Sequence, residues 1–145
     1  MLIDLKYNFT GISCLGLGKM EQLETMEYYI LQTQDILNAV YKDKEQTDKL
    51  AQVYVDENYK NIKIVASGSS GNGALCAKYI MEKYLRVDVT IISPYTFAYY
   101  PRLSEDDFVF VISQSGYSKN ALDALDVLKK LNRKTIALTG DLNSD

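Results

Sequence analysis

The stretch Phe108–Ser118, FVFVISQSGYS, indicates the fold class of this 145-residue chain. Its first five residues are apolar, as is typical of a parallel strand buried on both faces of a sheet. A serine-rich loop follows, and Asn120–Leu131 then repeats leucine at the spacing of an amphipathic helix. A buried strand, a polar loop and a helix in succession form the repeating unit of α/β proteins.

Three other short runs have the β-branched and aliphatic residues of strands: Ile62–Ala66 (IKIVA), Val87–Ile92 (VDVTII) and Thr135–Leu138 (TIAL). After the first of them, SGSSGNG (Ser67–Gly73) predicts a loop and Ala74–Leu85 a helix, in whose apolar pattern we expect Cys76 to be buried. The aromatic segment Tyr95–Tyr100 is compatible with a short helix. This order predicts an α/β fold, a three-layer doubly wound sheet of parallel strands. Because such sheets normally have at least one more strand than these four, we expect this one to lack its last strand.

The residues before this core form two parts. Two helices are predicted within residues 25–60, the second over Glu45–Tyr59 with Leu50 and Val53 turned inward. The first has apolar residues at the spacings of one helix face: Met26, Tyr29, Ile30, Ile36, Leu37, Val40 and Tyr41. Residues 1–24, interrupted by three glycines, are compatible with a hairpin, a flexible arm or an oligomer contact. We therefore divide the chain into an arm of unknown role (1–24) and one domain (25–145) with its α/β core at 61–145.

Composition and charge disfavour several function classes. A net charge of −3 argues against nucleic acid, whose phosphates need basic clusters. The chain has no His, and Cys14 and Cys76 lack the spacing of a zinc site, so we expect no histidine base, no metal and no cofactor. No leader pattern and no apolar run long enough to span a bilayer are visible, and the sparse cysteines fit a reducing compartment. The sequence predicts a cytoplasmic protein without a membrane span.

The two serine-rich loops are the candidate binding site. In the common 2-1-3-4 order, the first and third predicted strands are neighbours, so their loops face each other where open sheets bind ligands. Each loop precedes a helix, whose unpaired N–H groups favour an anion, and glycine lets the backbone approach closely. Neither loop has a cation, which predicts that a phosphate is bound by neutral dipoles. The alternative is that the serines only cap helices.

Nucleotide sites do not fit these loops. GSSGNG differs from the G-x-G-x-x-G pattern, no acid ends the second strand, and the Walker pattern is absent. The ligand should therefore be a smaller phosphate ester.

The pairing of ASGSSGNGA (66–74) with VISQSGYSKNALDAL (111–125) and TIALTGDLNS (135–144) resembles the SIS (sugar isomerase) domain family. S-Q-S-G-x-[ST] is its most specific element, and the likeness begins near Thr25. It points to the first SIS domain of the isomerase half of glutamine–fructose-6-phosphate aminotransferase and to paralogues without the glutaminase domain. The resemblance implies a flavodoxin-like fold, a sugar-phosphate ligand and a homodimer or higher homo-oligomer.

The resemblance also implies which residues hold the sugar phosphate: Gly68, Ser69, Ser70, Ser113, Gln114, Ser115, Gly116 and Ser118. Among them, Ser70 would contact the sugar hydroxyls. Ser118 stands where the family often has Thr, which keeps the hydroxyl, and Tyr117 stands where it often has Glu. The Glu that the family has after the second strand is not evident in SPYTFAYY (93–100).

No catalytic residue is assigned. Isomerisation of an aldose to a ketose needs a base, usually a carboxylate. In two-domain relatives the resemblance places the base, a ring-opening His and a Schiff-base Lys in the second half. We expect four acids to be solvated helix or turn residues: Glu82, Asp88, Asp123 and Asp126. Asp106 and Asp107 precede the third predicted strand, at the end away from the loops. We expect Lys119 to be an exposed residue at a helix start.

Three functions stay open. The first is the phosphosugar-binding first half of an amino-sugar-phosphate or fructosamine-phosphate isomerase, deaminase or deglycase, inactive alone. The second is a phosphosugar-sensing regulatory module without catalysis. The third is an oligomeric α/β domain whose serines only cap helices.

Overall fold

The structure is a computed structural model that describes residues 2–6, 25–42 and 44–140. Its elements follow in chain order: β1 (Leu2–Lys6), α1 (Met26–Lys42), α2 (Glu45–Asp56), β2 (Asn61–Val65), α3 (Gly68–Leu85), β3 (Asp88–Ile92), α4 (Pro94–Tyr99), β4 (Asp107–Ser113), α5 (Lys119–Lys130) and β5 (Thr135–Thr139). Among these residues, no helix is both long and apolar enough to cross a membrane.

The strands form one parallel sheet in the order β1-β5-β4-β2-β3. The sequence predicted four of these strands, β2, β3, β4 and β5. Numbered 1 to 4 in chain order, they lie in the sheet as 2-1-3-4, so the predicted order is confirmed. β1 was not predicted. Its residues Leu2 to Lys6 pair in register with Thr135 to Thr139 of β5. The position that we expected to stay empty beyond β5 is therefore taken by a segment from the other end of the chain.

This pairing gives part of the N-terminal arm a structural place that the sequence did not reveal. The prediction of a hairpin, flexible arm or oligomer contact otherwise falls on residues 7–24, which lie outside the described residues, as do Cys14 and the three glycines.

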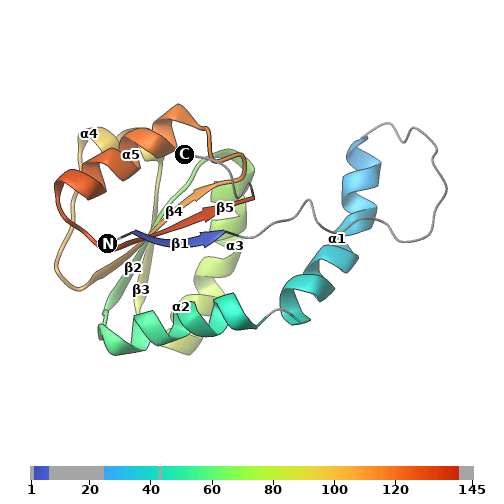
Figure 1. The fold of residues 1–145 in the computed structure, drawn as a ribbon, viewed down its shortest axis with the longest axis horizontal. Coiled ribbons are helices and arrows are strands. Elements are labelled where there is room, and N and C mark those ends of the chain that lie inside the picture. Colours follow the sequence, from blue (N-terminus) through green and yellow to red (C-terminus); the bar gives the residue numbers. More distant parts are fainter. Residues whose placement is uncertain (1, 7–24, 43, 141–145) are drawn as a thin grey trace.

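Two hydrophobic clusters, one on each face of the sheet, make the fold doubly wound. On the first face, Ile62, Ile64, Phe108 and Phe110 pack with Ala74 of α3, and side chains of α2 join them. The second face carries seven buried residues from the sheet, α4 and α5: Val65, Val109, Val111, Phe97, Ala121, Ala124 and Leu128. Figure 1 shows α4 and α5 on one side of the sheet and α2 on the other. The predicted three-layer α/β architecture is confirmed.

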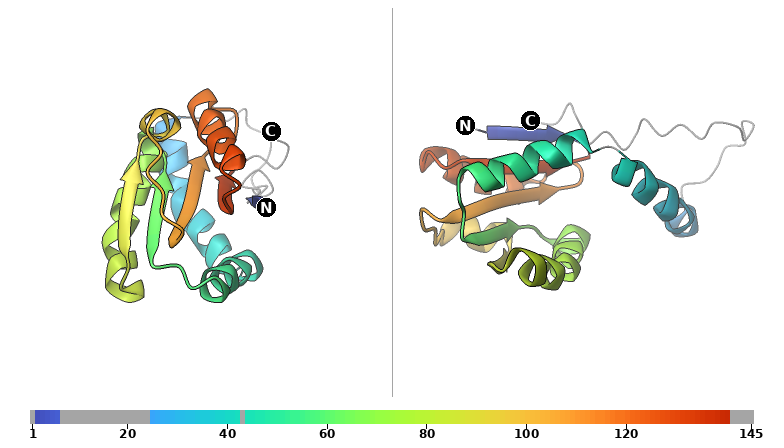
Figure 2. Two further views of the ribbon diagram at one scale, coloured as in Figure 1. Left: turned by 90° about the vertical axis from the view of Figure 1, so that its left-hand side faces the viewer. Right: turned by 90° about the horizontal axis from the view of Figure 1, so that it is seen from below.

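Four residues of the apolar face predicted for α1 are exposed: Met26, Ile30, Leu37 and Tyr41. Both Figure 1 and Figure 2 show α1 extending away from the body, on the side to which the strand arrows point. Met26 and Tyr41 are each 77% exposed, and Ile30 is 63% exposed. The expected burial of Cys76 is also wrong, because this side of α3 faces outward. Leu50 and Val53 of α2 do turn inward, as predicted.

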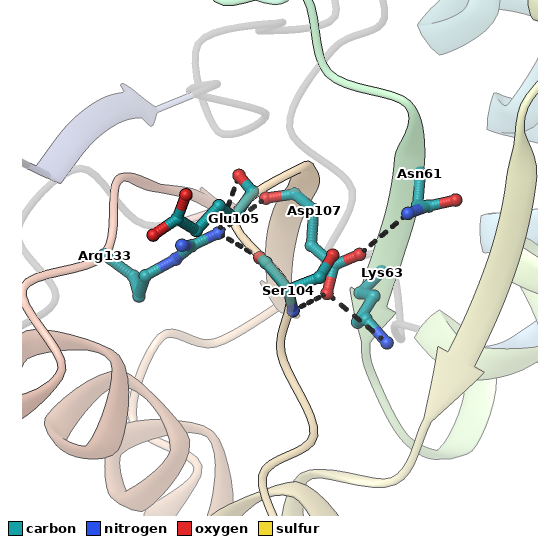
Figure 3. Close-up of polar contacts among 6 residues, drawn as sticks. All are labelled: Asn61, Lys63, Ser104, Glu105, Asp107 and Arg133. Carbon is teal, nitrogen blue, oxygen red and sulfur yellow. Dashed lines mark hydrogen bonds and ion pairs between the residues drawn. The ribbon is translucent and has the colours of Figure 1, made fainter.

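A polar cluster ties the amino-terminal ends of the strands together (Figure 3). The Asp107 carboxylate at the start of β4 accepts hydrogen bonds from the Asn61 amide group and from the Ser104 backbone N–H, at 3.2 and 2.7 Å. Lys63 lies 3.5 Å from the same carboxylate. The Arg133 guanidinium donates to the backbone carbonyls of Ser104, Glu105 and Asp107. These bonds fix the start of β4 against β2 and against the turn before β5.

Candidate functional site

The two serine-rich segments meet at the carboxyl ends of β2 and β4. These strands are neighbours, and the helices that follow them, α3 and α5, pack on opposite faces of the sheet. This is the switch point at which open α/β sheets bind ligands. A cavity of about 160 Å³ lies there.

Nine residues line this cavity, which we call the serine cavity: Ser67, Ser70, Pro94, Ile112, Ser113, Gln114, Ser115, Ser118 and Ala121. The structure thus brings together five of the predicted site residues: one from α3, the last residue of β4, and three from the segment between β4 and α5. It does not bring the other three, Gly68, Ser69 and Gly116, to the lining. Gly68 and Ser69 are exposed, and Gly116 is buried.

The segment Gly68–Gly73 is the start of α3, where the sequence predicted a loop. In that helix, successive side chains point in different directions, so Ser70 turns to the cavity and Ser69 does not. Gly68 has a φ of +58°, a conformation that residues with a side chain rarely adopt. The glycine therefore permits the sharp entry from β2 into α3.

Two serines at helix starts do not cap their helices through their side chains. Ser67 precedes α3 and Ser118 precedes α5, and neither hydroxyl accepts a capping hydrogen bond. Ser93, in the same position before α4, does accept one from the Thr96 backbone N–H at 3.1 Å. Ser67 and Ser118 both line the serine cavity, so the interpretation that their hydroxyls only cap helices does not fit this geometry.

The segment after β4 is held as a tight turn. The Gly116 N–H donates to the Ser113 hydroxyl oxygen at 3.2 Å, and the Tyr117 N–H donates to the Ser115 hydroxyl oxygen at 3.3 Å. Gly116 has a φ of +75°, which explains the glycine at this position. The Gly140 N–H donates to the Gln114 carbonyl oxygen at 3.0 Å and links the end of β5 to the turn. Both serine hydroxyls keep a hydrogen to donate to a ligand.

No charged residue is among those that line the serine cavity. Lys119 is exposed and paired with Asp123 at 2.9 Å, and hydrogen bonding to Asp123 raises the pKa of Lys119. Glu82 is paired with Lys78. Asp107 lies at the amino-terminal end of the sheet, as predicted. A cavity with these neutral donors can bind an anion through hydroxyl groups and helix N-termini.

Four lining residues were not among the predicted site residues: Ser67, Pro94, Ile112 and Ala121. The last three supply apolar surface beside the hydroxyls. Ser93-Pro94 ends the second predicted strand at the same sheet edge, and this was the one signal that could have placed Pro94 at the cavity.

A larger hollow of about 610 Å³ lies at the opposite end of the sheet, and no motif in the sequence indicated it. It is open and polar, with the ion pair of Lys63 and Asp107 among its lining residues and Arg102 beside it.

Comparison with known proteins shows the family to which this chain belongs. The SIS domain family matches residues 57–145. This chain belongs to the SIS domain family. The isomerizing glutamine–fructose-6-phosphate aminotransferase of Clostridium tetani is 33% identical over 123 residues, which are 83% of this chain and 19% of that protein. The SIS chain described here therefore spans less than a fifth of the length of that relative.

Solved SIS structures share the fold. The C-terminal domain of glucosamine-fructose-6-phosphate aminotransferase from Francisella tularensis matches 67% of this chain and 28% of that one, at 31% identity and a TM-score of 0.59. A proposed phosphosugar isomerase from Clostridium difficile 630 matches 83% of this chain and 34% of that one, at 23% identity and a TM-score of 0.67.

Proposed function

We propose that this SIS domain binds a sugar phosphate, with the phosphate group in the serine cavity. Ser70, Ser113, Ser115 and Ser118 supply the hydroxyl donors, together with Gln114. The observation that carries the proposal is that Ser67 and Ser118 start helices without capping them. Hydroxyl groups that face a shared cavity at the sheet's switch point are available to a ligand.

The size of the serine cavity indicates which part of the ligand it takes. Its 160 Å³ is below the roughly 300–1,000 Å³ of pockets that enclose whole small molecules. A phosphate group needs less room than a complete phosphosugar. The sugar would then extend out of the cavity, toward whatever completes the site.

We propose further that the domain is the first half of an amino-sugar-phosphate or fructosamine-phosphate isomerase, deaminase or deglycase. Moving a proton between adjacent sugar carbons needs a base. None of the residues lining the serine cavity is a carboxylate, so the base would come from a second SIS domain. A phosphosugar-sensing module without catalysis is the second candidate, and the uncharged lining supports it equally.

The proposal includes a homodimer or higher homo-oligomer in the cytoplasm. Large apolar side chains lie exposed on α1 and on α3, and extensive exposed apolar surface usually marks an interface. We call the second set the outer α3 stripe: Leu75, Tyr79, Ile80 and Tyr84, each at least half exposed.

Isothermal titration with fructose 6-phosphate, glucosamine 6-phosphate, inorganic phosphate and free fructose tests the binding proposal. The matched variants are Ser70→Ala and Ser69→Ala, because the first side chain lines the serine cavity and its neighbour does not. A hydrogen bond to a charged group contributes about 1.5–3 kcal/mol, so losing Ser70 should weaken phosphate-ester binding by roughly tenfold or more. Ser69→Ala should bind as the wild type does.

The outcomes separate the candidates. If neither phosphate ester binds, or free fructose binds as well as its 6-phosphate does, the proposal is wrong. If the esters bind, product analysis after incubation with the whole gene product distinguishes an isomerase, deaminase or deglycase from a sensor, which would leave the ester unchanged.

A further inference from the structure

An apolar groove runs beside the serine cavity on the first face of the sheet. It encloses about 360 Å³, and no charged residue lines it. Its lining comes from one side of α3 and from β2, β4 and β5: Ile64, Ser70, Gly73, Ala74, Ala77, Met81, Phe110, Ile112 and Leu138. Ser70 and Ile112 line the serine cavity as well. Whatever fills this groove would therefore form one wall of the ligand site.

The groove exists because the helices leave part of this face uncovered. α3 packs against β3 and, less extensively, β4, and α2 contributes side chains next to Phe108 near the amino-terminal end. Ile112 and Leu138, toward the carboxyl ends of β4 and β5, stay partly exposed. The α3 side presents small residues, and a Cβ added at Gly73 would meet no atom within 4 Å. A helix could approach closely along this side.

α1 has the complementary surface. Met26, Ile30, Leu37 and Tyr41 lie on one face at spacings of four and seven, and each is 59% or more exposed. The charged residues of α1, Glu27, Asp35 and Lys42, fall outside this apolar stripe. The stripe and the groove are thus both uncharged. α1 extends from the side of the body to which the strands point (Figures 1 and 2), and Ile112 and Leu138 of the groove lie toward those strand ends.

We propose that α1 of one copy packs in the groove of a second copy, and that the second copy's α1 does the same in return. This inference builds on the self-association proposed above and names its surfaces. A helix of 17 residues is about 25 Å long. Burying its apolar face twice in a symmetric pair covers on the order of 1,500 Å², the size of a stable interface. Each α1 would then close the side of the partner's serine cavity formed by Ser70.

Two variants test the packing of α1 in the partner's groove, one in the helix and one in the groove. Leu37→Glu places a charge in the α1 stripe, and Gly73→Leu fills the groove where the monomer has space. Leu31→Glu is the matched control, because Leu31 is 72% exposed on α1 but lies away from the stripe. Tyr84→Glu tests the outer α3 stripe as the competing interface. Sedimentation velocity over a range of concentrations measures the dimer, and hydrogen exchange measures protection of the α1 amides.

We expect Leu37→Glu and Gly73→Leu each to raise the dimer dissociation constant at least tenfold and to remove protection of α1. Leu31→Glu and Tyr84→Glu should dimerise as the wild type does. A monomer at all concentrations would overturn the proposal, as would a dimer broken only by Tyr84→Glu. If the α1 amides are protected in a monomer, α1 packs against its own chain, and the proposal is also wrong. Because phosphate-ester binding is titrated separately, loss of either proposal leaves the other testable.

Discussion

The Lys63 ammonium nitrogen lies 3.5 Å from the carboxylate of Asp107, whose side chain is only 2% exposed. Removing a carboxylate this fully from water is costly unless partners replace the water. Asp107 has three such partners in Lys63, Asn61 and the Ser104 backbone N–H. The carboxylate thereby joins β2, β4 and the loop before β4 into one unit at the end of the sheet opposite the serine cavity.

Asp107→Asn should therefore destabilise the domain. The amide keeps one acceptor oxygen but loses the charge that Lys63 and the two hydrogen-bond donors face. We expect the free energy of unfolding to fall by about 2–3 kcal/mol in urea titrations. Asp106→Asn is the control, since Asp106 pairs with Lys60 at the surface with half of its side chain exposed, and it should change stability by less than about 0.5 kcal/mol. Equal effects of the two substitutions would contradict this account.

The stabilisation by Asp107 should depend on pH. Burial alone would raise the pKa of Asp107, but hydrogen bonds from Ser104, the charge of Lys63 and the Asn61 amide together lower it. A carboxyl with a lowered folded-state pKa stabilises the fold above its unfolded-state pKa, and loses that contribution as the pH falls through the folded-state pKa. The gap in unfolding free energy between wild type and Asp107→Asn should therefore shrink below about pH 4. A gap that stays constant to pH 2 would refute the assignment.

Two glycines of α3 should respond in opposite ways to alanine. An added Cβ meets no atom within 4 Å at Gly68 or at Gly73, but only Gly68 has a positive φ, of +58°. Gly68→Ala should lower the free energy of unfolding by about 1–2 kcal/mol because of that backbone conformation. Gly73→Ala should raise the free energy of unfolding by roughly 0.5–1 kcal/mol, since alanine is more favourable than glycine in a helix interior. Thermal unfolding of the pair measures both signs. A gain for Gly68→Ala would mean that α3 begins later than described.

β1 should protect one edge of β5. Replacing residues 1–6 by a Gly-Ser segment of equal length keeps the chain length but weakens strand formation. We expect a loss of roughly 1–3 kcal/mol in unfolding free energy and faster hydrogen exchange of the β5 amides that pair with β1. The β2 amides, buried between β3 and β4, serve as the internal reference. Unchanged exchange in β5 would show that the pairing of β1 with β5 does not form in solution.

Much of the candidate site could be predicted because its signals are local. The run from Phe108 to Ile112 has no polar residue, and the serines begin where it ends, so strand, loop and helix follow directly from the order of residues. Parallel strands end at one edge, which brought Ser70 and Ser115 to one cavity in the prediction and in the structure. Ser69 does not line the cavity, because the segment that was predicted as a loop forms the first turn of a helix. In the helix that actually begins at Gly68, side-chain direction changes with each residue.

The sequence by itself determined the α/β class, four of the five strands that the structure describes, their order and the serine-rich edge, because these depend on hydrophobic patterns and on turn residues within short stretches. Only the tertiary structure decided what lies next to what over long separations. β1 has no pattern that names β5 as its partner, and it pairs there because an edge with unpaired backbone groups is available. The same holds for α1, whose stripe predicts a buried face but not the surface that buries it. Asp107 reads in the sequence only as an acid at the start of the third predicted strand, remote from the loops, and the approach of Lys63, Asn61 and Ser104 makes it a buried link between strands.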